Sequence, residues 1–444
     1  MNTLQHAKYQ ADSLHDYALN YRPLFRDIRV FNTFESLLTG ILGSGSGCIQ
    51  RIAASIPGAA DNSERRLRRL VHDENKRVSF SPDNLSQTLT REGAQFLHDA
   101  DSVEVIVDGS DLRKPQSQNL PYLDHVRDLQ GQLINGYRTL EAIGRASDGR
   151  QAILFQQTYS TQTPNFISEK RILKDALFAI VRELRAAGVQ KITFIMDRGF
   201  DDLKVFRWLG AELHVKFVIR GMHFDRSTQR TPTAEPQALV KLMDSFPVLG
   251  RFTMKRPVKD KRGKVSWRPT LVEVRAGEIW LDHGKLPMNA VRLAFPSCPR
   301  DDREGWLLLT NLPVDTLEAA GAVVRLYLSR WSIEDVFEWT KQALGWEEVR
   351  LLDFPAFQRL VTCIWIAAAF VFRLGAAKET PEVKLLASLG GYMFHTGRPP
   401  GKKILLRGLR RLVDEEMVRL YHRHHPNAPT PQQTLNSLLG TLHK

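Results

Sequence analysis

Two short apolar runs that each end in an aspartate constrain the fold of this chain more than any other feature. The first run, VEVIVD, ends at Asp108, and the second, KITFIMD, ends at Asp197. Both are short and rich in β-branched residues, as buried strands are. Either aspartate alone is more typical of a strand-end cap. Together they would lie where an open sheet presents its ligands.

The segments around these runs predict the rest of a mixed sheet. Strands are expected at 137–145 and 151–159, joined by the turn signal SDG at 147–149. A helix is expected at 169–187, where Gly188 ends it, then a helix at 201–209 and a strand at 214–220. The resulting order, β-β-β-α-β-α-β, predicts an α/β chain with a ribonuclease-H-like mixed-sheet core.

The changes of pattern along the chain predict five regions. A helical, DNA-binding region is followed by the first part of the core, a β-rich insertion, the second part of the core with a helix carrying several charged residues, and a basic helical C-terminal region that is a candidate for dimerisation. Their expected bounds are 1–95, 96–224, 225–310, 311–375 and 376–444.

The charge balance favours a polyanionic partner. Lys and Arg number 62 against 49 Asp and Glu, which gives a net charge of +13. Nucleic acid and an anionic membrane surface both fit this balance. The longest apolar run, at 360–372, is shorter than the roughly 20 residues of a membrane-spanning helix, and the N-terminus shows no secretory signal. We therefore expect a cytoplasmic protein without a membrane partner.

The positive charge is concentrated in three segments. Segment 251–268 holds eight Lys or Arg against one acid, and segment 401–444 holds eight against three. A third group, Arg65, Arg66, Arg68 and Arg69, follows a Pro-Gly turn between two expected helices. A DNA contact and a solvated helix face are equally compatible with this arginine group.

Three other features have ordinary explanations. The GSGSG stretch at 43–47 lacks the Lys-Ser/Thr pair of a phosphate-binding loop and is expected to be a turn. The three cysteines have no C-x-x-C spacing, which argues against a disulfide framework or a structural zinc site. The histidines at 422–425 fit a basic surface better than a metal site.

A third carboxylate comes with a set of charged companions. In YLSRWSIEDVFEWTK, the residues Tyr327, Arg330, Glu334 and Lys341 fall within an arc of about 60° on one helix. Arg330 and Glu334 alone could be a simple i, i+4 pair on an exposed helix. Two strand aspartates and a helix glutamate would also supply the oxygen ligands that two Mg²⁺ ions need for phosphodiester chemistry.

Asp108, Asp197 in MDRGF and the Y-x2-R-x3-E-x6-K helix together resemble the DDE transposases of bacterial insertion sequences, specifically the group with the Y-R-E-K signature and a β-rich insertion. The resemblance extends over roughly residues 30–375. It implies that Asp108, Asp197 and Glu334 are catalytic and hold Mg²⁺, for which Mn²⁺ can substitute.

The resemblance also implies DNA-binding roles. Tyr327, Arg330 and Lys341 would contact phosphates near the transposon end. Trp306, which lies 28 positions before Glu334, would hold a base that leaves the duplex when a hairpin forms at the excised end. Without this context, Trp306 is more typical of a core residue. No organic cofactor is implied.

The expected function is therefore a transposase that binds terminal inverted repeats and excises and inserts DNA by metal-dependent strand cleavage and transfer. Its expected partners are double-stranded DNA and a second copy of the chain in the synaptic complex. Two alternatives stay open at this point. One is a ribonuclease-H-like structure-specific nuclease, and the other is a transposase-derived DNA-binding regulator that no longer cuts.

Overall fold

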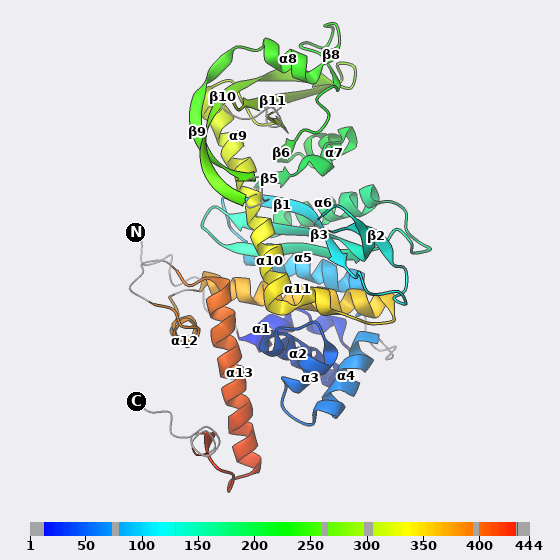
Figure 1. Ribbon diagram of the computed structural model, residues 1–444, viewed down its shortest axis with the longest axis vertical. Coiled ribbons are helices and arrows are strands. Elements are labelled where there is room, and N and C mark those ends of the chain that lie inside the picture. Colours follow the sequence, from blue (N-terminus) through cyan, green and yellow to red (C-terminus); the bar gives the residue numbers. More distant parts are fainter. Residues whose placement is uncertain are drawn as a thin grey trace.

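The computed structural model describes residues 13–72, 80–128, 130–259, 265–296, 305–377, 379–393, 399–431 and 433. It is elongated, with a sheet in its upper and middle parts, helices at its lower end, and the helix α13 (Lys402–His424) running down one side (Figure 1).

The core of the sheet is built from four neighbouring strands. Strand β1 (Ser102–Arg113) lies between antiparallel β3 (Leu133–Ala146) and parallel β5 (Lys191–Met196), and β5 pairs in parallel with β6 (Lys216–Arg220). Strands β2 (Asp124–Arg127) and β4 (Gln151–Tyr159) both pair with β3. The SDG turn joins β3 to β4 as predicted, with Gly149 at φ +90°. This arrangement confirms the predicted ribonuclease-H-like mixed sheet.

The strands of segment 225–310 extend this sheet. Strand β12 (Trp306–Thr310) pairs with β6 on one side and with β11 (Leu286–Ala294) on the other. Beyond β11 lie β10 (Val265–Leu281) and β9 (Val248–Lys259), which form a long curved arm. Shorter elements accompany them: β7 (Ser227–Thr228), β8 (Gln237–Ala238) and α8 (Leu239–Ser245). The expected basic hairpin lies in this arm, although its residues 260–264 fall outside the described chain.

Two hydrophobic clusters cover the two faces of the sheet. One contains α6 (Glu169–Ala186), α7 (Leu203–Arg207) and the odd-numbered apolar residues of β1. The other contains α9 (Leu317–Ser329), α10 (Trp331–Leu344) and α11 (Phe354–Ala376), with Ile106 and Ile195 from the sheet. Helix α5 (Pro82–Phe96) contributes to both clusters. The alternation of side chains along β1 therefore places Ile106 and Asp108 on the same face as α10.

Helix α11 is long and apolar enough, by length and composition, to cross a membrane. It is 23 residues long, but 83% of its most apolar window is buried inside the protein. It contacts β4 and α5, and the N-terminal helices lie below it (Figure 1). These surroundings are those of a core helix.

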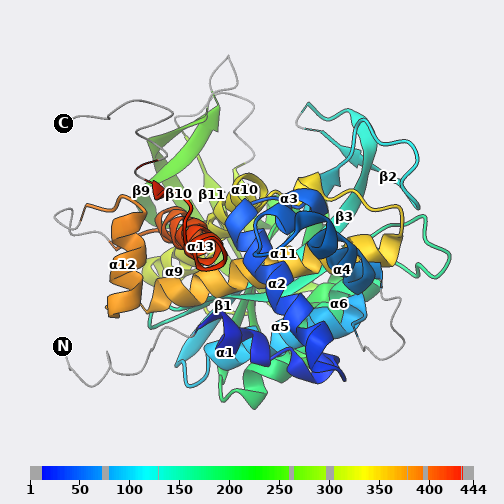
Figure 2. The same cartoon turned by 90° about the horizontal axis from the view of Figure 1, so that it is seen from below.

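The remaining helices gather at the lower end of the molecule, where Figure 2 shows them from below. The N-terminal ones are α1 (Leu14–Leu19), α2 (Ile28–Ser44), α3 (Ile49–Ala54) and α4 (Ala60–His72), and the C-terminal ones are α12 (Pro381–Leu389) and α13. The GSGSG stretch ends α2 and forms the turn that follows it, with Gly45 at φ +62°. A Cβ on Gly47 would lie 2.6 Å from the carbonyl oxygen of Gly345, so this turn packs closely against the end of α10.

Candidate active site

Asp108 and Asp197 lie side by side on the sheet. The last parallel pair between β1 and β5 is Val107 opposite Met196, and each aspartate is the next residue of its chain segment. Each is also two residues beyond an isoleucine of the α10-side cluster. Both carboxylates are therefore directed to the same face. Strand β1 differs from the prediction in continuing to Arg113, because it stays paired with β3.

The predicted signature helix is two helices in the structure. Helix α9 ends at Ser329 and α10 begins at Trp331, with Arg330 between them in helical conformation. Bonds from Arg330 N to Tyr327 O and from Ile333 N to Arg330 O span three residues rather than four. The Ser329 hydroxyl also donates to Glu104 on β1 at 3.0 Å. This junction lies over β1 and directs Arg330 toward Asp108.

Arg330 joins two of the three predicted carboxylates. Its Nη1 donates to Asp108 Oδ2 at 2.9 Å, and its Nη2 donates to Glu334 Oε1 at 2.7 Å. The Arg330 side chain is only 7% exposed, whereas that of Glu334 is 44% exposed. The guanidinium thus lies between a half-buried aspartate and an accessible glutamate.

The third carboxylate is held by a different partner. The Tyr327 hydroxyl donates to Asp197 Oδ1 at 3.0 Å. The Tyr327 ring packs edge-on against Trp306, with centroids 5.5 Å apart, and the Arg220 guanidinium lies 5.5 Å from the Trp306 ring centre. Trp306 is 7% exposed. The structure therefore brings Trp306 next to the acidic cluster, but as a covered ring.

The electrostatics reflect how closely these groups lie. Burial raises the pKa of Asp108 to about 7; Arg330 opposes this rise, and the charge of Asp197 adds to it. Burial acts to lower the pKa of Arg330, but neighbouring groups, led by Tyr327 and Asp108, outweigh it and keep that pKa above its ordinary value. Burial, with the Asp197 charge, raises the pKa of Tyr327 to about 12. Tyr327 is therefore a neutral donor at pH 7.

The sequence of this chain matches the family model described as the transposase DDE domain over residues 99–370, which is more than half of the chain. The chain belongs to this family. The match extends from just before β1 to within α11, so it includes both aspartates, the whole arm and both helices of the site.

Lys341 pairs with an acid other than Asp108, Asp197 and Glu334. Its Nζ is 3.3 Å from Glu347 and 5.7 Å from the centre of the Trp346 ring. It lies on α10, as Glu334 does, whereas Tyr327 lies on α9. The charge of Lys341 also acts to lower the pKa of Glu141, although burial raises that pKa strongly overall.

Glu141 is a site neighbour that sequence reasoning missed. It lies opposite Asp108 in the β1–β3 register and is fully buried. One oxygen accepts from Thr139 Oγ1 at 3.0 Å, while Oε1 has no hydrogen-bond partner in the described part of the protein. Its sign in the sequence is an acidic residue within the otherwise apolar stretch LEAIG. Without the register, that signal does not point to Asp108.

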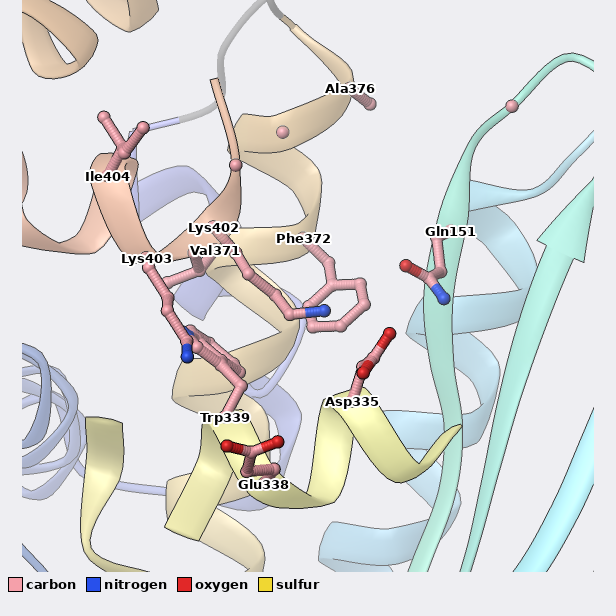
Figure 3. Close-up of a pocket in the computed structure, with 13 residues that line it drawn as sticks. Gln151, Asp335, Glu338, Trp339, Val371, Phe372, Ala376, Lys402, Lys403 and Ile404 are labelled. Carbon is pink, nitrogen blue, oxygen red and sulfur yellow. The ribbon is translucent and has the colours of Figure 1, made fainter. Parts of the chain in front are cut away.

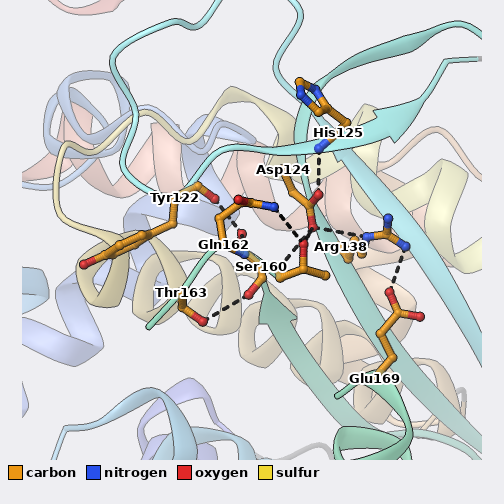
Figure 4. A network of polar contacts seen from close by, with 9 residues as sticks. Tyr122, Asp124, His125, Arg138, Ser160, Gln162, Thr163 and Glu169 are labelled. Carbon is orange, nitrogen blue, oxygen red and sulfur yellow. Dashed lines mark hydrogen bonds and ion pairs between the residues drawn. The ribbon is translucent and has the colours of Figure 1, made fainter. Parts of the chain in front are cut away.

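A hollow of about 380 Å³ opens beside Asp108 and Asp197 and extends to Arg138 and Lys170. Arg138 is held in place at its wall. Its Nε donates to Asp124 at 3.2 Å, and its Nη1 donates to Glu169 at 2.8 Å (Figure 4). Asp124 also accepts from the backbone and side chain of Thr161. This network fixes β2 and β3 on the side of the transposase site that lies away from α10.

The other acids of α10 face elsewhere. Asp335 and Glu338 line a hollow of about 520 Å³ together with Trp339, Phe372 and Lys402 (Figure 3). The Lys402 ammonium lies 5.0 Å from the Phe372 ring centre, and burial lowers its pKa. Asp335 follows Glu334 directly in sequence but belongs to this separate environment between α10, α11 and α13.

The carboxylates of the transposase site fit a divalent cation chemically. Asp108, Asp197 and Glu334 supply only hard oxygen ligands, and Asp197 and Glu334 each raise the pKa of Asp108 by repulsion. Among the described residues, however, no three acidic, histidine or cysteine side chains are grouped closely enough to hold one ion. The Arg330 guanidinium lies between Asp108 and Glu334 and offsets part of their negative charge.

Proposed function

We propose that this DDE transposase binds the terminal inverted repeats of its own element and moves it by cut-and-paste, through hairpin ends, as a member of the Y-R-E-K group. The observation that carries the proposal is the meeting of Asp108 and Asp197 with the Arg330–Glu334 pair at one face of the sheet. The products would be cleaved donor DNA and an element joined to target DNA. The reaction would take place in the bacterial cytoplasm.

In this proposal Asp108, Asp197 and Glu334 hold Mg²⁺ or Mn²⁺. Bound there, the ions would activate the attacking water or 3′ hydroxyl and stabilise the leaving oxygen of the phosphodiester. Tyr327 orients Asp197 by donating to it. Arg330 holds Asp108 and Glu334 toward each other, and its two parallel donors also match the geometry of a phosphate.

The proposed DNA contacts involve residues of the site and exposed cations of the N-terminal helices. Tyr327, Arg330 and Lys341 are proposed to meet phosphates at the transposon end. Helix α4 buries Leu67 and Leu70 and exposes Arg65, Arg66 and Arg69, which fits end recognition by the N-terminal helices. We expect binding to weaken steeply with salt, because such contacts release counterions.

The second copy is proposed to dock on α13. Of the 23 residues of this helix, only Leu405, Leu406 and Gly408, near its start, are buried. Its distal half exposes Val418 and Tyr421. A helix whose distal half presents apolar side chains at the surface supports a role in a homodimer that holds two DNA ends.

Strand transfer is the experiment that separates this function from its alternatives. A pre-cleaved end duplex with a free 3′ hydroxyl is incubated with supercoiled plasmid and Mg²⁺. The transposase is expected to yield plasmid joined to the end. A structure-specific nuclease would instead cut a four-way junction without joining, and a regulator would bind the end and do neither.

Trp306→Ala is expected to preserve the first nick and to lower hairpin formation about 5- to 150-fold, which corresponds to the loss of one base-stacking contact. The measurement is the ratio of hairpin to nicked product on end DNA. This ratio is insensitive to the fraction of folded protein, which the loss of a ring buried against Tyr327 will also lower. Trp306→Phe should retain part of the hairpin yield, and a normal yield from Trp306→Ala would contradict the role.

A further inference from the structure

Trp267 is a large aromatic side chain that the rest of the protein covers only in part. It lies on β10, in the long arm, and is 52% exposed. Its neighbours on the same side of the strand, Pro269 and Leu271, are exposed as well, while Thr270 and Val272 are buried. A large exposed apolar surface of this kind indicates an interaction site more often than an isolated surface residue does.

The contacts of Trp267 connect it to the acidic site. Its ring meets Trp331, the first residue of α10, edge-on with centroids 5.4 Å apart. The Arg330 guanidinium lies 5.4 Å from the Trp331 ring centre on its way to Asp108. Trp267 thus contacts Trp331, Trp331 contacts Arg330, and Arg330 donates to Asp108. A continuous series of contacts joins the exposed ring to the proposed catalytic aspartate. The edge-on contact with Trp331 leaves about half of the Trp267 surface exposed to solvent.

The charges around Trp267 favour a nucleic acid over a protein partner. Lys255 on β9 is exposed and lies opposite Pro269, so its ammonium belongs to the same face of the arm as the Trp267 ring. Cations along a strand, with an exposed aromatic ring among them, form the usual surface on which the unpaired bases of a nucleic acid stack.

Trp306 offers no comparable surface in this structure. Arg220 lies over its ring, and Phe295 and Tyr327 pack against its edges. A base could reach it only after a covering side chain moved. Trp267 is open without any rearrangement.

We propose that Trp267, backed by Trp331, stacks on an unpaired base of the DNA end held at the Asp108–Asp197–Glu334 site. This proposal rests on the proposed function, because it states which structural form of the DNA end the proposed catalytic site binds. The ligand is a single-stranded or frayed end, recognised by the flat face of a base rather than by its sequence.

Binding without cleavage tests this assignment. The full-length protein is titrated, without added metal ion, into two duplexes of the same sequence. One is blunt, and the other carries a two-nucleotide overhang with 2-aminopurine, whose fluorescence is quenched by stacking. Wild type is expected to quench the probe and to prefer the overhang. Trp267→Ala should lose the quenching and bind the overhang about 5- to 150-fold more weakly, with unchanged affinity for blunt DNA.

Two further variants separate stacking from packing. Trp267→Phe keeps a ring and should retain part of the quenching, whereas Trp267→Leu keeps apolar bulk against Trp331 and should not. Val248→Ala, which removes an exposed apolar side chain from the far end of β9, should behave as wild type. Equal quenching by wild type and Trp267→Ala, or an equal loss of affinity for blunt and overhanging DNA, would overturn the assignment. If Trp267 quenches the probe normally but the wild-type protein cuts no DNA, the proposed function fails and the assignment of Trp267 stands.

Discussion

Glu334→Gln is expected to reduce cleavage of end DNA at least about 10³-fold, because a ligand charge worth several kcal/mol in the transition state is lost. The substitution keeps the size of the side chain and one oxygen that can accept from Arg330 Nη2. The Glu334 side chain is 44% exposed, so we expect little change in the free energy of unfolding. The measurement is the initial rate of nicking under saturating DNA.

Asp335→Asn is the matched control for this variant. It removes one carboxylate from the neighbouring position of the same helix, but Asp335 lines the hollow beside Lys402 rather than the acidic cluster. It should nick DNA at the wild-type rate, and both variants should bind end DNA as wild type does. Equal activity of Glu334→Gln and Asp335→Asn would mean that Glu334 is not part of the catalytic machinery.

Arg330→Ala is expected to lower the nicking rate by about 10²- to 10³-fold, the usual effect of removing one fixed donor from a catalytic site. The physical reason is that Arg330 is the hydrogen-bonded link between Asp108 and Glu334. Without it, two like charges face each other with no cation between them. General binding to non-specific duplex should change much less than the rate.

Arg330→Lys tests whether the planar guanidinium matters. A lysine restores the positive charge but cannot donate two parallel bonds in a fixed fork, so we expect only partial recovery of the nicking rate. Thermal unfolding of both variants is the control for a purely structural ion pair. If Arg330→Ala unfolds at a lower temperature but nicks at the wild-type rate while folded, Arg330 has no part in catalysis.

The residues that sequence reasoning placed well are those whose local pattern determines their position. The apolar runs before Asp108 and Asp197 predicted buried strands, and the order of elements predicted a mixed sheet in which the two strand ends meet. Parallel pairing of β1 and β5 then brings the aspartates together. Arg330 and Glu334, four residues apart, could be placed on one helical face in the same way.

Other features depend on tertiary contacts that no local pattern contains. Helix α9 ends at Ser329, which bonds to Glu104 on β1, so the residues predicted on one helix are divided between α9 and α10. The closure of the arm onto α10 through Trp267 and Trp331 joins residues 64 positions apart in sequence. The pairing of β12 with β6, which makes the arm continuous with the core sheet, is likewise long-range.

Cleavage of linear DNA that carries this gene with its natural flanks tests the central claim most directly. Wild type and Asp197→Asn are compared with Mg²⁺, with Mn²⁺ and with a chelator, and the cut positions are mapped to the nucleotide. We predict cuts at both boundaries of the element by wild type with either metal ion, and none with the chelator or the variant. Cuts that persist with the chelator, cuts made equally by Asp197→Asn, or binding of the boundaries by wild type with no cut at all would contradict the account.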